Sequence, residues 1–309
     1  MKPLVVSVVG PTAVGKSRLG VEIAKQFSGE VISGDSMQIY RGMDIGTAKV
    51  TTKEMEGIPH HMIDIKNPQE SFSVAEFQEK VQSLIVEITE RGHLPVLVGG
   101  TGLYIQATLF NFNFSDQPKD EEVYKRLEEE LKIEGAEAMY ARLVKIDPSQ
   151  AAKIHPNNER RVLRALEIHE ATGKTMSEYQ NLQAEDGDFR PIIIGLEMDR
   201  EQLYKRINMR VDEMMKDGLL EEVEALYRDG LEDAQSMKAI GYKEFVPYLK
   251  GEYSLDRAVE LLKRNSRRYA KRQYTYFRNK MQVQWYEVTE ENYEDKFTTI
   301  LRDLAGMMQ

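Results

Sequence analysis

A glycine-rich segment near the N-terminus has the residue types and the spacing of a phosphate-binding loop. Residues 10–17 read GPTAVGKS and fit the pattern G-x-x-x-x-G-K-[ST]. Glycine tolerates positive φ angles that bring backbone N–H groups close to phosphate oxygens, and a helix beginning here adds the positive end of its dipole. We expect Lys16 to neutralise a phosphate oxygen and the Ser17 hydroxyl to bind Mg²⁺. The alternative is an ordinary glycine turn, but the segment lies between a predicted strand and a predicted helix, as a phosphate-binding loop does.

Two further segments follow predicted strands and should face the same crevice. Residues 99–104, GGTGLY, replace the acid that an ATPase or many kinases carry at this strand end, and Thr101 there could reach a phosphate or a reacting group. Residues 33–40, SGDSMQIY, contain Asp35, whose carboxylate could act as a general base or bind Mg²⁺ through water. The pattern leaves two structural alternatives open, namely a tight turn at Thr101 and an Asx turn or helix cap at Asp35.

The elements that position these residues alternate between strand and helix. Short β-branched runs predict strands, and apolar residues at spacings of three and four predict helices. This order is typical of an α/β fold in which helices cover a parallel sheet, resembling P-loop NTPases. The predicted strands are residues 4–9, 31–33, 94–98, 191–198 and 282–288, and the predicted early helices are residues 17–27 and 74–91.

The middle of the chain lacks strand signals and predicts a helical insertion. Charged helical stretches cover residues 121–132 and 158–170, and turn-like polar runs lie at 115–118 and 185–188. We therefore expect an insertion domain at residues 116–188 and a catalytic core made of residues 1–115 and 189–309.

Charge is distributed unevenly along the 309 residues. The net charge is −9, yet residues 257–280 contain nine Lys or Arg and one acid, a local charge of +8. Polyanion binding depends on such local patches because salt screens charges beyond roughly 8 Å. This stretch also contains four aromatic residues, which could stack on bases at a nucleic-acid interface. The alternative is an amphipathic helix whose charges are solvated and whose aromatics lie in the core. The aromatics are Tyr269, Tyr274, Tyr276 and Phe277.

Several classes of protein are excluded by what the sequence lacks. Without cysteine it can form neither a disulfide nor a thiolate metal site, and the spacing of its five histidines does not suit zinc. Its apolar runs fall far short of the ~18 residues that a membrane span needs, and the N-terminus does not read as a signal peptide. We expect a cytoplasmic protein without membrane contact.

Seven segments, in order over most of the chain, resemble those of the bacterial tRNA dimethylallyltransferases. The eukaryotic members carry a C-terminal zinc finger that this chain cannot build. The matching segments are residues 10–17 (GPTAVGKS), 35–41 (DSMQIYR), 58–61 (IPHH), 99–104 (GGTGLY), 159–167 (ERRVLRALE), 239–242 (AIGY) and 268–273 (RYAKRQ).

This resemblance implies that a dimethylallyl group is transferred from dimethylallyl diphosphate to N6 of adenosine 37, next to the anticodon of tRNA. Asp35 then matches the base that accepts the amine proton, and Thr101 a residue that supports the reacting centre. Arg210 matches an arginine that grips the diphosphate, although a solvated helix arginine is its alternative. The implied diphosphate site, with Mg²⁺ at Ser17, comprises Gly10, Thr12, Ala13, Val14, Gly15, Lys16, Ser17 and Arg210.

The same resemblance implies contacts with the anticodon stem-loop, whose target base must leave its stack. Gln38 would offer its amide to a base edge, and the arginines at 160, 161 and 164 would contact phosphates. The implied tRNA-binding residues are Asp35, Ser36, Met37, Gln38, Glu159, Arg160, Arg161, Val162, Leu163, Gly241, Tyr242, Arg268, Lys271 and Arg272.

Three other functions use part of the same features. A kinase of a small metabolite would bind ATP in the same loop and transfer its γ-phosphate. An adenylate isopentenyltransferase would modify a free nucleotide, but it would need neither the helical insertion nor the basic stretch. A non-catalytic RNA-binding switch would retain its function without Asp35. A monomer suffices for the leading hypothesis, because a crevice that admits a stem-loop needs no partner subunit.

Overall fold

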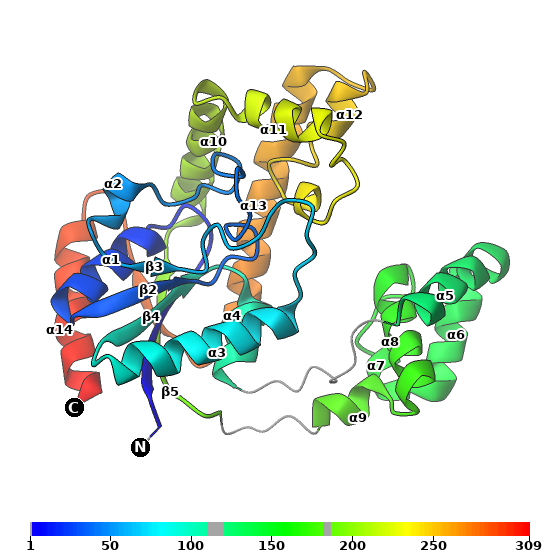
Figure 1. Cartoon of the computed structure of the whole chain (residues 1–309), viewed down its shortest axis with the longest axis horizontal. Coiled ribbons are helices and arrows are strands. Elements are labelled where there is room, and N and C mark those ends of the chain that lie inside the picture. Colours follow the sequence, from blue (N-terminus) through cyan, green and yellow to red (C-terminus); the bar gives the residue numbers. More distant parts are fainter. Residues whose placement is uncertain (1, 111–119, 182–186) are drawn as a thin grey trace. The chain divides into compact units, whose positions relative to one another are not determined.

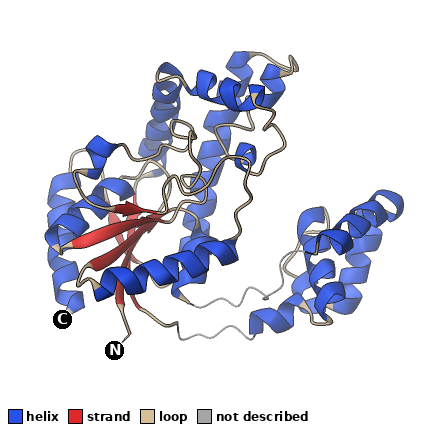
Figure 2. Ribbon diagram, viewed as in Figure 1, coloured by secondary structure: helices blue, strands red, loops and turns tan. Residues whose placement is uncertain are grey.

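The structure is a computed structural model that describes residues 2–110, 120–181 and 187–309. In these ranges six parallel strands form one sheet in the order β3-β2-β4-β1-β5-β6, with helices on both faces (Figures 1 and 2). The predicted α/β class is therefore confirmed. The strands are β1 Leu4–Val9, β2 Gly29–Ser33, β3 His60–His61, β4 Leu94–Gly99, β5 Arg190–Glu197 and β6 Gln284–Glu287.

The central strand β1 is apolar because both of its faces are covered. Val8 pairs in register with Val98 of β4 on one side and with Ile194 of β5 on the other. Helices α1 (Lys16–Gln26) and α14 (Tyr293–Met308) pack on the sheet face that includes Val8, while α3 (Val74–Glu90) and α4 (Gly102–Leu109) pack together beside β4. All the functional turns predicted from the sequence follow the carboxyl ends of these strands.

The predicted boundaries are close to those observed, with one strand missed. Helix α1 begins one residue earlier than expected, and Leu19 and Ile23 are fully buried, as their spacing predicted. Strand β3 consists of only two residues, so it has no alternation or apolar run to reveal it.

Several helices extend the catalytic core beyond the sheet. The long helix α13 (Leu255–Lys280) begins at the N-cap Ser254 and contacts both α10 (Arg200–Lys216) and α4. The remaining elements of this part are α2 Thr52–Met55, α11 Leu219–Arg228, the 3₁₀ turn Ser236–Lys238 and α12 Val246–Leu249.

The chain divides into two compact units, of which one is Met1–Leu109 with Asp188–Gln309 and the other Phe110–Gly187. The described part of the second unit, residues 120–181, contains helices and no strand, and its apolar core is formed by side chains such as Leu127, Leu143 and Leu166. The expected edge of the insertion at 115–118 lies outside the described residues, as do residues 185 and 186 of the run at 185–188. Its helices are α5 Glu121–Glu134, α6 Ala136–Ile146, α7 Pro148–Ala151, α8 Glu159–Thr172 and α9 Met176–Asn181.

Candidate active site

The phosphate-binding loop joins β1 to α1, and its backbone explains its glycines. Gly10 has a φ angle of 141°, and a Cβ there would lie 2.5 Å from the carbonyl oxygen of Leu196. Gly15, at the N-cap of α1, has a φ angle of 97°. Ala13 also adopts a positive φ, 67°, which the sequence did not reveal. The loop thus turns sharply into α1, whose first N–H groups are available to bind an anion.

Three distant side chains hold this loop in shape. Gln273 of α13 accepts a hydrogen bond from Thr12 N (2.8 Å) and donates one to the Gly100 carbonyl (3.0 Å). Arg206 Nε donates to the Ala13 carbonyl (3.1 Å), and the Tyr293 hydroxyl donates to the Val14 carbonyl (3.1 Å). Sequence reasoning assigned no role to any of the three, because each lies far along the chain from the loop.

Two basic side chains, Lys16 and Arg210, lie at the loop, and neither forms an ion pair with a described carboxylate. Lys16 Nζ donates to the Pro11 carbonyl (2.7 Å). Burial and, to a smaller extent, the Arg210 charge together lower the pKa of this amine to about 7, against the opposing effect of Asp35. Arg210 forms no ion pair with any described carboxylate, and burial lowers its pKa. Both line a pocket of about 580 Å³ that includes Thr12 and Ser17. A polyphosphate or diphosphate is the anion that such a site suits.

Asp35 lies just beyond the end of β2 and lines the same pocket. One of its oxygens accepts from Met37 N (2.8 Å), so the predicted Asx turn is present while the carboxylate still lines the pocket. Burial raises the pKa of this carboxyl, against the opposing effects of the Met37 N–H group and the Lys16 charge. A carboxylate with these properties can accept a proton from a substrate.

Thr101 comes from the neighbouring strand end and meets the Asp35 segment. Its Oγ1 accepts a hydrogen bond from Ser36 N (3.2 Å). Tyr269 of α13 hydrogen-bonds with Thr101 and Gln273, and burial raises the pKa of its hydroxyl. The two predicted turns therefore meet each other and α13 at one place.

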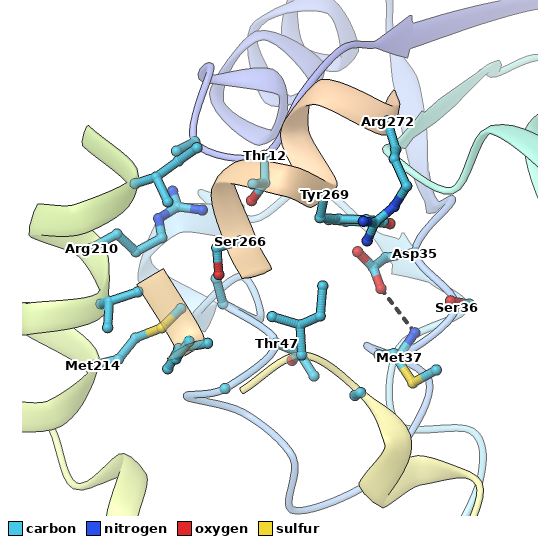
Figure 3. Close-up of a pocket in the computed structure, with 18 of the residues that line it drawn as sticks. Thr12, Asp35, Ser36, Met37, Thr47, Arg210, Met214, Ser266, Tyr269 and Arg272 are labelled. Atoms are coloured by element: carbon cyan, nitrogen blue, oxygen red, sulfur yellow. Dashed lines mark hydrogen bonds between the residues drawn. The ribbon is translucent and has the colours of Figure 1, made fainter. Parts of the chain in front are cut away.

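A second pocket of about 270 Å³ shares Thr12, Asp35, Arg210 and Tyr269 with the first (Figure 3). One part of its lining is apolar and comes from α10, α13 and the turn before residue 241, whereas Asp35, Ser36 and Met37 form another part. An apolar group attached to a diphosphate can lie here beside the Asp35 carboxylate. The apolar lining residues are Ile207, Val211, Met214, Ile240 and Leu262.

The fit of a magnesium ion depends on Ser17. Its side chain is exposed at the edge of the larger pocket and bonds to no described residue. Among the residues that the structure describes, no group of three or more His, Asp or Glu side chains is arranged to hold a metal. The site therefore suits an ion that takes most of its ligands from phosphate and water, as Mg²⁺ often does.

The basic stretch forms an exposed cationic face on α13. Arg268, Lys271 and Arg272 are exposed and, within the described ranges, pair with no carboxylate; the Arg272 guanidinium lies over the Tyr269 ring. Other charges of the stretch are already neutralised, in the pairs Arg257–Glu260, Lys263–Asp212 and Arg278–Glu197. The free cationic surface is thus narrower than the local charge suggests.

Three of the four aromatics on α13 pack within the protein, as the core alternative predicted. Tyr274 stacks on Trp285, and its hydroxyl accepts a hydrogen bond from Met198 N (2.8 Å). Tyr276 donates to Gln106 (2.6 Å), and Phe277 is fully buried. The fully buried Phe277 cannot stack on RNA bases, whereas stacking by the half-buried Tyr274 and Tyr276 stays a prediction. Of the four aromatics, only Tyr269 lines the two pockets that meet at Asp35.

Several residues implied to bind tRNA face inward instead. Val162 and Leu163 are 1% and 2% exposed in the core of the helical unit, because they form the apolar side of α8. Gly241 and Tyr242 are buried as well. The side chains of Val162, Leu163 and Tyr242 pack inside the protein, and Gly241 has no side chain, so we withdraw these four residues as side-chain contacts with RNA.

Two polar predictions also need correction. Gln38 donates to the Thr47 and Ala48 carbonyls (3.3 and 3.2 Å) and accepts from Ser33 Oγ (2.9 Å), so its N–H donors are used within the protein, while its oxygen keeps one lone pair at the larger pocket. Arg164 pairs with the buried Glu167. Glu159, Arg160 and Arg161 are exposed at the start of α8.

Known proteins resemble this chain over most or all of its length. The family model described as IPP transferase matches residues 38–280. A tRNA dimethylallyltransferase of Oceanobacillus iheyensis is 57% identical over 309 residues, covering 100% of this chain and 99% of the relative. A second, from Geobacillus thermodenitrificans, is 54% identical over 310 residues, covering 100% and 98%.

Solved structures show the same similarity. The tRNA isopentenylpyrophosphate transferase of Bacillus halodurans has a TM-score of 0.76 and 52% identity, covering 99% of this chain and 96% of its own. A eukaryotic dimethylallyltransferase acting on tRNA has a TM-score of 0.83 and 34% identity, covering 96% of this chain and 77% of its own. In the part of the chain that is described, no helix is long and apolar enough to cross a membrane.

Proposed function

The chain belongs to the IPP transferase family, and from the site described above we propose that it transfers a dimethylallyl group from dimethylallyl diphosphate to N6 of adenosine 37 in tRNA. It is a transferase that modifies tRNA, as its full-length relatives are named. The observation that supports the finer assignment is that Asp35 and Arg210 line the same two pockets as the phosphate-binding loop. A general base, an anion-binding arginine and an apolar surface are then available to one reaction.

The proposed reaction breaks the C–O bond of the allylic diphosphate and forms a C–N bond. The loop N–H groups, Lys16 and Arg210 stabilise the diphosphate, which leaves with the electron pair of the broken bond. The exocyclic amine attacks the allylic carbon, and its proton passes to the Asp35 carboxylate, whose pKa is raised by burial. Thr101 and Ser36 hold the Asp35 segment in place through their hydrogen bond (3.2 Å).

Mg²⁺ is part of this proposal. The Ser17 hydroxyl and diphosphate oxygens would hold the ion, which would add positive charge at the leaving group.

The RNA partner is the anticodon stem-loop. Arg268, Lys271 and Arg272 on α13, and Arg160 and Arg161 on α8, are exposed cations suited to its phosphates. The acceptor base must be extruded from its stack to reach Asp35. We further propose that the protein acts as a monomer, because one subunit contains the whole pocket. We also propose that it acts in the cytoplasm.

Binding of diphosphate should be coupled to proton uptake by Lys16. The pKa of this amine is about 7 in the free protein, so at pH 8 most of it is neutral, and a bound anion raises that pKa again. We expect titration calorimetry of inorganic diphosphate with Mg²⁺ at pH 8, in two buffers of different ionisation enthalpy, to report about one proton more for the wild type than for Lys16→Arg. Equal proton uptake by both proteins would contradict this role.

Affinity for tRNA should fall steeply with salt through the exposed cations of α13. Replacing Arg268, Lys271 and Arg272 together by glutamine should reduce the slope of log affinity against log salt by about 2 to 3. The matched control replaces Arg257 and Lys263, which are already ion-paired, and should change the slope by less than about 1. An unchanged slope in the triple variant would remove this face from the interface.

The reaction itself is tested with labelled dimethylallyl diphosphate, Mg²⁺ and unmodified tRNA, in parallel with AMP, ADP and ATP. We expect label on the adenosine 3′ of the anticodon and none on free nucleotides. Label on a free nucleotide would favour the adenylate transferase, and transfer of γ-phosphate from ATP would favour the kinase.

A further inference from the structure

The carboxylate of Glu222, on α11, binds three consecutive backbone N–H groups of a distant loop. It accepts from Asp44 N (2.8 Å), Ile45 N (2.9 Å) and Gly46 N (3.0 Å). The hydroxyl of Tyr242 donates to the same carboxylate at 2.5 Å. Hydrogen bonds to an ionised acceptor are roughly twice as strong as neutral ones, so the three backbone bonds fix the loop firmly to α11, and the fourth joins Tyr242 to the same carboxylate.

The loop and the Gly241–Tyr242 turn pack closely beside this carboxylate. Tyr242 is fully buried, and a Cβ on Gly46 would lie 2.5 Å from its ring. Gly241 has a φ angle of 106°, and a Cβ there would lie 2.9 Å from the Gly46 carbonyl oxygen. Gly241 N donates to Glu244, which fixes the turn from its other side (2.9 Å). The glycine-tyrosine pair therefore presses directly on the loop backbone.

The loop continues into the wall of the active site. Gly46, Thr47 and Ala48 line the smaller pocket together with Asp35. The Thr47 and Ala48 carbonyls accept from the Gln38 amide, which belongs to the same segment as Asp35. A continuous set of hydrogen bonds thus runs from Glu222 through residues 44–48 to the segment that carries the base.

The groups that hold the diphosphate are supported differently. The phosphate-binding loop bonds to Gln273, Arg206 and Tyr293, and none of its described hydrogen bonds involves residues 44–48. Thr47 and Ala48 line both pockets, but their carbonyl groups bond to the Asp35 segment and not to the phosphate-binding loop. Displacing residues 44–48 should therefore disturb Asp35 and its contact with the acceptor base more than the groups that bind the diphosphate.

We propose that Glu222 and Tyr242 are positioning residues, which clamp residues 44–48 so that the Asp35 segment and the pocket wall fit the acceptor base. This assignment rests on the proposed function, because the acceptor is the RNA base of that reaction. It gives the glycine-tyrosine pair a role within the protein, in place of the RNA contact that the sequence resemblance implied.

The test compares Glu222→Gln and Tyr242→Phe with the control Glu221→Gln. Glu221 is exposed on the same helix, so its replacement makes the same change of charge without touching the loop. Tyr242→Phe keeps the ring against Gly46 and removes only the hydroxyl, so it should fold even if the Glu222 variant does not. For each protein, KM for tRNA, KM for dimethylallyl diphosphate, kcat and the melting temperature are measured, with transfer by the wild type verified first.

We expect KM for tRNA to rise about tenfold or more in Glu222→Gln and by less in Tyr242→Phe, with KM for dimethylallyl diphosphate changed less than about threefold. The double variant should resemble Glu222→Gln alone, because both residues act on one loop. Unchanged KM for tRNA in both variants, or equal losses for both substrates alongside a lower melting temperature, would overturn the proposal. Failure of the wild type to transfer would instead reject the proposed function.

Discussion

Replacement of Asp35 by asparagine should lower the rate of dimethylallyl transfer by about 10²- to 10⁴-fold, which is the usual contribution of a general base. Asparagine retains an oxygen for the hydrogen bond from Met37 N, so the turn should persist while the proton acceptor is lost. Affinity for tRNA should stay within about threefold of the wild type, because the cations of α13 are untouched. Single-turnover transfer and equilibrium RNA binding measure the two quantities separately.

The matched control for this variant is Asp217→Asn, because Asp217 also lines the larger pocket but ends α10 at its exposed surface. Its transfer rate should remain close to that of the wild type. In the wild type, kcat should rise with pH as Asp35 loses its proton. Because burial raises the pKa of Asp35, this rise should occur at a higher pH than an exposed aspartate would give. Full activity in Asp35→Asn would reject Asp35 as the base.

Arg210→Met should lower kcat/KM for dimethylallyl diphosphate by about 10²- to 10³-fold, the size of effect seen when one preorganised group that stabilises developing charge is removed. Methionine preserves much of the apolar stem on α10, so the loss reports the guanidinium rather than the packing. The charge matters because Arg210 lines both pockets and finds no carboxylate partner among the described residues.

Lys205→Met is the control for Arg210, because Lys205 is exposed on the same helix. Its kcat/KM should change less than about threefold. If Arg210→Met behaved like Lys205→Met, Arg210 would be an ordinary solvated arginine, and the anion site would consist of the loop and Lys16 alone.

Local patterns explain why the core of the site was predictable. The spacing within residues 10–17, and the strands on either side of the Asp35 and Thr101 turns, are properties of short segments. Once a parallel sheet is inferred, its strand ends must meet at one edge, which brings these turns together. The sheet, the loop and the elements around them could therefore be derived before any coordinates.

The supporting contacts could not be derived in this way, because they join distant residues. Gln273 lies 261 residues from Thr12, and Glu222 lies 178 residues from Asp44. The sequence pattern also gave wrong predictions where one residue type suits both RNA binding and the protein core. Tyr242 and Phe277 are aromatics suited to RNA, but both are fully buried in the protein. Likewise, a run of basic residues does not show which of them are ion-paired until the neighbouring helices are placed.

The position of Gln273 has an energetic consequence for the two substrates. The helix that carries the exposed cations also supplies the side chain bonded to Thr12 N and to the Gly100 carbonyl. A shift of this helix on binding RNA would therefore alter the fit of the diphosphate. Thermodynamic reciprocity then requires the donor to change the affinity for RNA by the same factor. The amide of Gln273 would thus couple binding of RNA on α13 to binding of the diphosphate donor at the loop.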